Sequence, residues 1–135
     1  MRNRDAVLSD LRPDIPSAKV LPGMTPEEQF QNNTLRPIAK LQDQLLVAVF
    51  RNYARKHKNV FYDLSVEKRI DYIENAIHKD MKFRNSLKGM IIGQFTLQEY
   101  QLYIQNSSAL NKRMMNIVKE RLKSNLQLME YAQVS

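Results

Sequence analysis

The feature that most constrains how this chain folds is an apolar pattern at helical spacing in its C-terminal third. The pattern starts at Thr96, which with Glu99 has the spacing of a capping box, and Phe95 is placed to pack on Tyr100 as a hydrophobic staple. Such a stripe must be covered by other helices, so the sequence predicts a helical protein. The apolar residues of the stripe are Leu97, Tyr100, Ile104, Leu110, Met114, Ile117, Val118, Leu122, Leu126 and Met129.

A single unbroken helix over this stretch would be too long for a globule of this size. It would measure about 50 Å at 1.5 Å per residue, against about 35 Å for the diameter of the domain. The polar residues between positions 106 and 111 would also fall on the apolar stripe, where they need partners. We therefore expect a break at Asn106–Ser108, with Ser108 capping a final helix from Ala109 to about Tyr131. The alternative is a projecting helix that pairs in a homodimer.

The preceding sequence predicts two helices between residues 25 and 57. Thr25 and Glu28 form a second capping-box pattern, which begins a short helix that ends near Asn32 and Asn33. A long helix from Leu35 to about His57 follows, and we expect it to be the central helix of the core. Its apolar residues fall in one broad sector and are Leu35, Ile38, Leu41, Leu45, Leu46, Val49, Phe50 and Tyr53. If this is the core, replacing Leu45 with Ala costs about 2 to 5 kcal/mol.

Two further helices are predicted between residues 65 and 93. Ser65 is placed to cap the first of them, and Asp80 to cap the second, which ends around Gly93 in a left-handed turn. Residues 1–24 contain three prolines and no sustained periodicity, which predicts an extended, flexible arm. The expected fold class is therefore all-α: a compact bundle of four to five helices forming a single helical domain over residues 25–135, with the extended arm over residues 1–24.

Charge and cysteine content limit the classes of function. Lys and Arg number 21 against 14 Asp and Glu, which gives a net charge of +7 and a pI near 9.7. This balance favours nucleic acid or another polyanion as a partner. The chain has no cysteine, which excludes disulfides, thiolate metal sites and thiol nucleophiles. Its apolar runs are too short for a signal-peptide core or a membrane span, so we expect a soluble cytoplasmic protein with no membrane partner.

The basic residues gather in one segment, because residues 35–58 alone carry a net charge of +5. At 100° per residue, one face of the long helix presents the candidate anion-binding or nucleic-acid-binding residues, which are Arg36, Lys40, Arg51, Arg55 and Lys58. A secondary basic cluster consists of Lys112, Arg113, Lys119 and Lys123. An ordinary solvated face is the alternative, and no aromatic residues interleave with these cations to stack on bases.

No pattern of catalytic or metal-binding residues occurs. His57 and His78 are the only histidines, and neither belongs to a His-x-x-x-His or Glu-x-x-His arrangement. No serine lies in a Gly-x-Ser-x-Gly turn. We expect no catalytic residue, no metal and no cofactor, and we interpret the Glu74/His78 spacing as an ordinary surface pair.

The stretches FRNSLKGMIIGQFT and YIQNSSALNKRMM, within residues 34–115, carry a resemblance. About two-thirds of the chain resembles a set of small helical bacterial proteins of uncharacterised function, some of which are labelled glyoxalase. Glyoxalase I consists of paired βαβββ modules that hold a metal through His, Gln and Glu side chains on strands, and this sequence has no such strands. The resemblance implies one helical unit over residues 25–135 and carries over no functional residue.

Three functions follow as hypotheses. The leading one is a non-enzymatic cytoplasmic interaction protein that binds a protein partner or itself, with the proline-containing arm ordering on binding. The alternative is sequence-independent nucleic-acid binding through the basic helix face. A glyoxalase-type metalloenzyme is the least favoured, because the sequence lacks the metal-ligand pattern.

Overall fold

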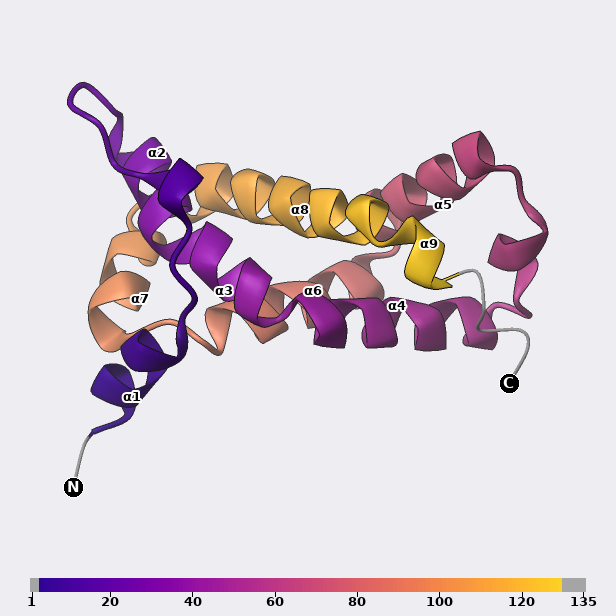
Figure 1. Cartoon of the computed structure of the whole chain (residues 1–135), viewed down its shortest axis with the longest axis horizontal. Coiled ribbons are helices and arrows are strands. Elements are labelled where there is room, and N and C mark those ends of the chain that lie inside the picture. Colours follow the sequence, from indigo (N-terminus) through magenta and orange to yellow (C-terminus); the bar gives the residue numbers. More distant parts are fainter. Residues whose placement is uncertain (1–2, 130–135) are drawn as a thin grey trace.

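The computed structural model describes residues 3–129 and confirms the all-α fold class, with no strand in that range. The longest helix, α8 (Ser107–Ser124), runs along the long axis of the molecule (Figure 1). Its main helix contacts are with α3 to α7 and with α9. These and the remaining helices are α1 (Arg4–Leu11), α2 (Pro26–Phe30), α3 (Arg36–Leu41), α4 (Asp43–Lys56), α5 (Val66–Lys79), α6 (Met81–Ile92), α7 (Leu97–Ile104) and α9 (Leu126–Met129).

The described residues form more helices than the predicted four to five, because α1 forms in the predicted arm and the predicted helix from Leu35 to His57 is interrupted. The predicted helix from Leu35 to His57 breaks at Gln42, where φ is −88° and ψ is 2°, and becomes α3 and α4. The C-terminal stretch breaks at Asn106, as expected, but α8 begins at Ser107, so the prediction that Ser108 caps this helix is wrong. The helix ends at Ser124 and is interrupted at Asn125, and the predicted end at Tyr131 lies outside the described residues.

The predicted helix end near Asn32 and Asn33 is wrong, because the chain passes without a gap from α2 into α3. A wide π-helical turn, Gln31–Leu35, joins them, and the Arg36 N–H donates to the Gln31 carbonyl. Pro37, which follows, has no N–H, and its ring collides with a carbonyl in an ordinary helix interior. The wider turn accommodates the proline, so one continuous helical path leads into the core.

Most of the predicted helix starts are confirmed. Thr25 and Thr96 each form a complete capping box with the glutamate three residues later. The side chains of Ser65 and Asp80 accept hydrogen bonds from the backbone N–H groups three residues on. The left-handed end at Gly93 is wrong, because φ there is −61° and ψ is −15°.

The core contains two groups of aromatic rings. Phe50 contacts Phe61, Tyr72 and Phe83 where α4, α5 and α6 meet. At the other end, Phe95 packs edge-on against Phe30 and against Tyr103. Phe95 thus contacts Tyr103 and not the predicted staple partner Tyr100, which is exposed.

The prediction of an extended N-terminal arm is also wrong for the described part of that segment. Residues Arg4–Leu11 form α1, which is capped by Asn3 through its side chain and the Ala6 N–H. A short 3-10 turn, Pro16–Ala18, follows, and Ala18 is buried. Figure 1 shows α1 beside α7 at one end of the molecule. The segment is held there by long-range contacts that local periodicity does not reveal.

Candidate interaction surfaces

The five candidate cations of residues 35–58 do not share one helix. Arg36 and Lys40 belong to α3, and Arg51 and Arg55 belong to α4. Lys58 follows the end of α4 and has a left-handed φ of 63°. The count of 100° per residue that aligned them does not extend across the break between α3 and α4. The predicted continuous basic face is therefore divided.

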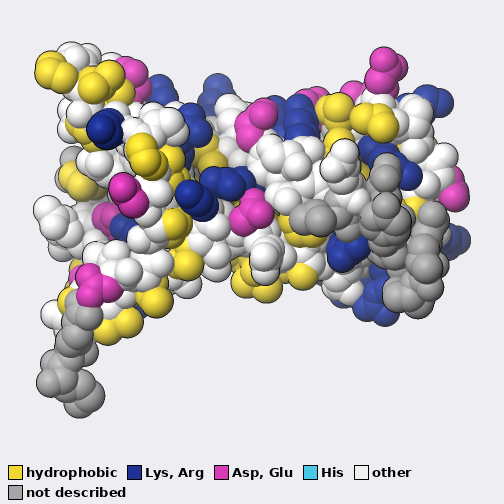
Figure 2. All heavy atoms as spheres, viewed as in Figure 1, with side chains coloured by type: hydrophobic (Ala, Val, Ile, Leu, Met, Phe, Trp, Pro, Cys, Tyr) yellow, Lys and Arg dark blue, Asp and Glu magenta, His cyan; other side chains and the backbone are white. Residues whose placement is uncertain are grey.

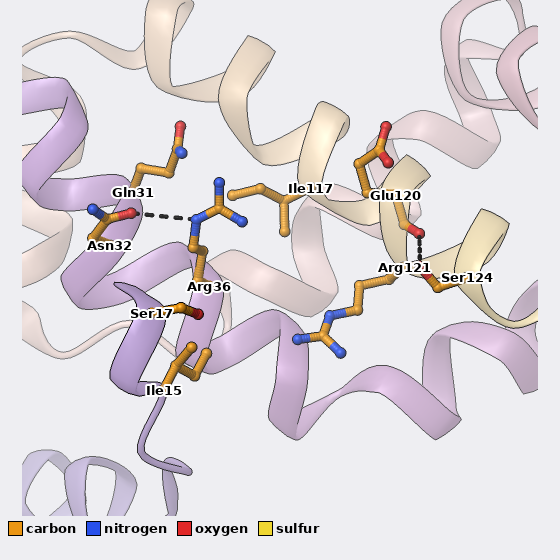
Figure 3. A pocket seen from close by; sticks show the side chains of 9 residues that line it. All are labelled: Ile15, Ser17, Gln31, Asn32, Arg36, Ile117, Glu120, Arg121 and Ser124. Atoms are coloured by element: carbon orange, nitrogen blue, oxygen red, sulfur yellow. Dashed lines mark hydrogen bonds between the residues drawn. The ribbon is translucent and has the colours of Figure 1, made fainter. Parts of the chain in front are cut away.

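Instead, the fold brings Arg36 next to part of the secondary basic cluster. A hollow of about 620 Å³ lies between the α3 region and α8, and a second of about 460 Å³ adjoins it. Both are lined by Gln31, Arg36, Ile117 and Glu120, and we call the two together the α3–α8 groove. Figure 3 shows the side chains that line the first hollow. Figure 2 shows Lys and Arg side chains along this part of the surface. The basic side chains that line the groove are Arg36, Lys112, Arg113 and Arg121.

Neutral amides hold two of the groove arginines in place. The Arg36 Nε donates to Asn32 Oδ1 at 3.3 Å, and the Arg113 Nη1 donates to Gln31 Oε1 at 2.8 Å. An amide orients a guanidinium without neutralising its charge. Within residues 3–129, the Nη groups of Arg36 have no protein partner. They are therefore available to an anion.

Carboxylates offset part of the groove's charge. Arg121 Nη1 lies 3.5 Å from Asp43 Oδ1, and Glu120 also lines the groove. Arg121 and Glu120 were absent from the sequence-based candidates. The available signal was the recurrence of Arg113, Ile117 and Arg121 at intervals of four, which places them on one side of α8.

The other half of the secondary cluster serves a different contact. Lys123 Nζ donates to Glu74 Oε1 at 2.8 Å, and Lys119 Nζ lies 3.9 Å from the same oxygen. The hydrogen bond from Lys123 and the charges of both lysines hold the pKa of Glu74 below its ordinary value. Lys119 and Lys123 thus join α8 to α5, whereas Lys112 and Arg113 face the groove.

The outward face of α7 is apolar. Leu97, Tyr100 and Ile104 lie within about 60° of one another around the helix axis and are between 46% and 70% exposed. The helix packs inward through Tyr103 and the partly buried Glu99 instead. The predicted burial of this part of the stripe is therefore wrong. We call these three residues the α7 face.

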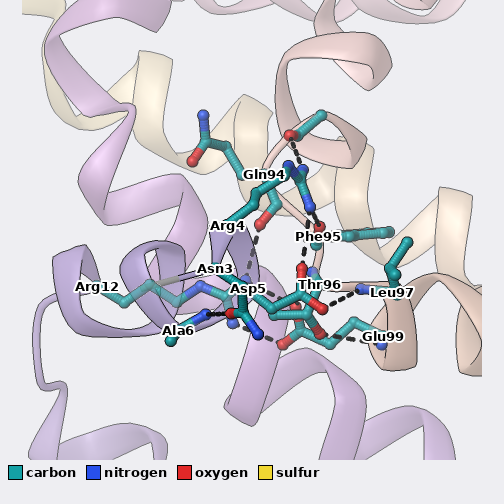
Figure 4. A network of polar contacts seen from close by, with 11 residues as sticks. Asn3, Arg4, Asp5, Ala6, Arg12, Gln94, Phe95, Thr96, Leu97 and Glu99 are labelled. Carbon is teal, nitrogen blue, oxygen red and sulfur yellow. Dashed lines mark hydrogen bonds and ion pairs between the residues drawn. The ribbon is translucent and has the colours of Figure 1, made fainter. Parts of the chain in front are cut away.

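A polar network attaches α1 to the start of α7 (Figure 4). The Arg12 guanidinium makes two bonds to the Glu99 carboxylate, of 2.6 and 2.7 Å, and a third to the Gln94 carbonyl. The buried Thr34 hydroxyl donates to Glu99 Oε2 at 2.8 Å, and the Thr96 N–H donates to Glu99 Oε1. We call this network the Glu99 clamp. It joins three segments that are distant in sequence.

Two opposing effects act on the pKa of Glu99. Burial disfavours the charged carboxylate and would raise the pKa. The hydrogen bonds from Arg12, the Thr96 amide and Thr34, together with the Arg12 charge, outweigh burial and lower the pKa. The clamp thus holds an ionised carboxylate in a protected position.

Both histidines lie beside side chains that connect helices of the bundle. The His57 ring stacks on Tyr53, whose hydroxyl donates to the Asp80 carboxylate that caps α6. Burial and this hydrogen bond raise the pKa of Tyr53 to about 12. Burial and the nearby charges of Lys119 and Arg84 lower the pKa of His78, and Glu74, its predicted partner, bonds to Lys123.

The described residues contain neither a metal-binding cluster nor a membrane-spanning helix. No group of three or more His, Asp or Glu side chains between residues 3 and 129 is placed to hold a metal ion. In the same range, no helix is both long and apolar enough to span a membrane.

No family model, curated protein or solved structure matches this chain. The resemblance to small helical bacterial proteins therefore stays a prediction.

Proposed function

We propose that this chain is a non-enzymatic cytoplasmic interaction protein that self-associates through the α7 face. The observation that carries the proposal is the exposure of Leu97, Tyr100 and Ile104 on one side of a well-capped helix. Apolar residues that gather on an ordered helix face mark protein interaction sites more often than singly scattered ones do. Val7 and Leu11 of α1, at the same end of the molecule, are exposed as well.

The chemistry of α7 favours a second copy of the chain as the occupant. Each molecule carries a net charge of +7, so most of its surfaces repel another copy. The only charged side chain of α7 is Glu99, which is engaged by Arg12. The exposed glutamines at 98, 101 and 105 flank the face, and each amide is both a donor and an acceptor. An isologous contact, in which the same patch meets itself, suits such a surface.

Sedimentation velocity over a range of protein concentrations tests this proposal. The patch is small, so we expect a weak dimer with a dissociation constant on the order of 10 to 100 µM. Replacing Ile104 with Glu should weaken the dimer at least about tenfold, because the contact loses the burial of an isoleucine and must desolvate a charge. The α-helical circular dichroism should be unchanged.

The control is Val66→Glu, which places the same charge on another exposed apolar residue, at the first position of α5. It should leave association unchanged. A wild-type protein that stays monomeric at several hundred micromolar would reject self-association. Equal weakening by the two variants would show that charge alone, and not the α7 face, governs association.

A further inference from the structure

The α3–α8 groove is a second surface, independent of the α7 face. We infer that it binds the phosphodiester backbone of nucleic acid without reading its sequence. Four cations line it, namely Arg36, Lys112, Arg113 and Arg121, against the carboxylate of Glu120, and Arg121 also lies 3.5 Å from Asp43 Oδ1. Two of the arginines are oriented by amides and keep guanidinium N–H groups for a ligand. Guanidinium groups bind phosphate oxygens through paired, charge-assisted hydrogen bonds.

The shape of the groove favours a chain of phosphates over a single one. The two hollows adjoin along α8, and Arg113 and Arg121 are separated by about 12 Å of helix at 1.5 Å per residue. One strand of B-DNA advances about 3.4 Å per phosphate, so this distance spans three to four phosphates. The cations are spread along the groove and do not converge on one point. An extended polyanion can contact them all.

The residues that line the groove also indicate which part of the nucleic acid they contact. Among residues 3–129, no aromatic side chain lines either hollow, and the apolar side chains that line the groove are Ile15, Ala109 and Ile117. Stacking on bases therefore has no platform here, and the contacts are to phosphates. This site differs from the sequence-predicted basic face, because Lys40, Arg51, Arg55 and Lys58 do not line the groove.

Fluorescence anisotropy with labelled single- and double-stranded oligonucleotides of unrelated sequence measures the binding. Four phosphate contacts predict a slope of log affinity against log salt of about −3.6 for duplex and about −2.8 for single strands. For the duplex, affinity should fall about 100-fold between 50 and 200 mM salt. Sequence should have little effect. Absence of binding at low salt and micromolar protein would overturn the inference.

Matched variants locate the site. The double variant Arg36→Ala/Arg113→Ala should reduce the magnitude of the duplex slope by about 1.8, because two contacts are lost. The double variant Lys40→Ala/Arg55→Ala removes the same charge from exposed positions outside the groove and should leave the slope unchanged. The reverse result would place the contact on the sequence-predicted face and reject the groove.

A variant that is expected to bind more tightly shows that the weaker binding of the other variants is not caused by loss of folding. The Glu120→Gln variant removes the groove's own carboxylate and should tighten binding about two- to fivefold, the scale of an exposed charge interaction. Weaker or unchanged binding would contradict the inference. Inorganic tripolyphosphate serves as the competitor: if it binds as tightly as the oligonucleotides, the groove is a site for small anions and not for nucleic acid.

Discussion

Replacing Leu46 with Ala should destabilise the protein by about 2 to 5 kcal/mol, whereas the same change at Leu45 should cost less than about 1 kcal/mol. Leu46 is 0% exposed in the core, and Leu45 is 51% exposed on α4. Truncating a buried leucine loses its transfer free energy and leaves a cavity. A half-exposed leucine loses little of either. The loss of stability that the sequence predicted for Leu45→Ala is therefore expected for Leu46→Ala instead.

Urea unfolding monitored by circular dichroism measures both changes. If the free energy of unfolding falls with urea at the same slope in both variants and in the wild type, the three unfolding transitions are comparable. The two variants have the same composition, so helix propensity and unfolded-state effects largely cancel between them. A larger loss at Leu45 than at Leu46 would mean that α4 presents a different face to α8.

Breaking the Glu99 clamp should cost about 3 to 5 kcal/mol in the Arg12→Ala variant. The side chains of Arg12 and Glu99 are only 10% and 15% exposed, so removing one partner leaves the other charge poorly solvated. Glu99→Ala should cost at least as much, because Thr34 and the Thr96 N–H also lose their acceptor. Arg55→Ala, an exposed arginine that contacts Asn52 on its own helix, should stay within about 0.5 kcal/mol.

The double variant Arg12→Ala/Glu99→Ala completes a thermodynamic cycle. It should lose less stability than the two single variants added together, because neither remaining charge is stranded. Strict additivity would show that the two side chains do not interact in solution. Hydrogen exchange in α1 should accelerate in all three variants, since the clamp holds α1 against α7.

Acid titration gives a second measure of the clamp. Folding lowers the pKa of Glu99 from its ordinary value of 4.5, so the folded state favours the ionised carboxylate. Its contribution to stability is therefore complete above pH 4.5 and is lost as the pH falls through the lower folded pKa. The stability difference between wild type and Glu99→Gln should shrink below pH 4.5. A constant difference down to pH 2 would contradict the lowered pKa.

Several features of the fold could be predicted from neighbouring residues alone. Thr96 and Glu99, three positions apart, determine where α7 starts, and Ser65 and Asp80 do the same for α5 and α6. A cap satisfies backbone N–H groups within its own turn, so it needs no information from the rest of the chain. The break at Asn106 was predicted because an unbroken C-terminal helix would be longer than the diameter of the domain.

The candidate surfaces could be predicted only in part. Arg36, Lys112 and Arg113 were identified as candidates from charge, but their gathering in one groove requires α3 to lie along α8. Arg121 was missed, because its place in the same hollow as Arg36 depends on how α3 packs against α8. The α7 face was correctly predicted to be apolar, but it was wrongly expected to be buried. Periodicity locates an apolar stripe on a helix without showing whether another element covers it.

The local sequence thus determined the helical class and the caps of α2, α5, α6 and α7, which depend on interactions within a few residues, but it did not show the break at Gln42. The tertiary structure decided which apolar residues are buried, as Leu45 and Leu46 show. It also ordered the N-terminal segment, through bonds between Arg12 and Glu99 that join residues 87 positions apart. Helix periodicity carries no information across such a separation, because the partner is chosen by packing and charge in the folded chain.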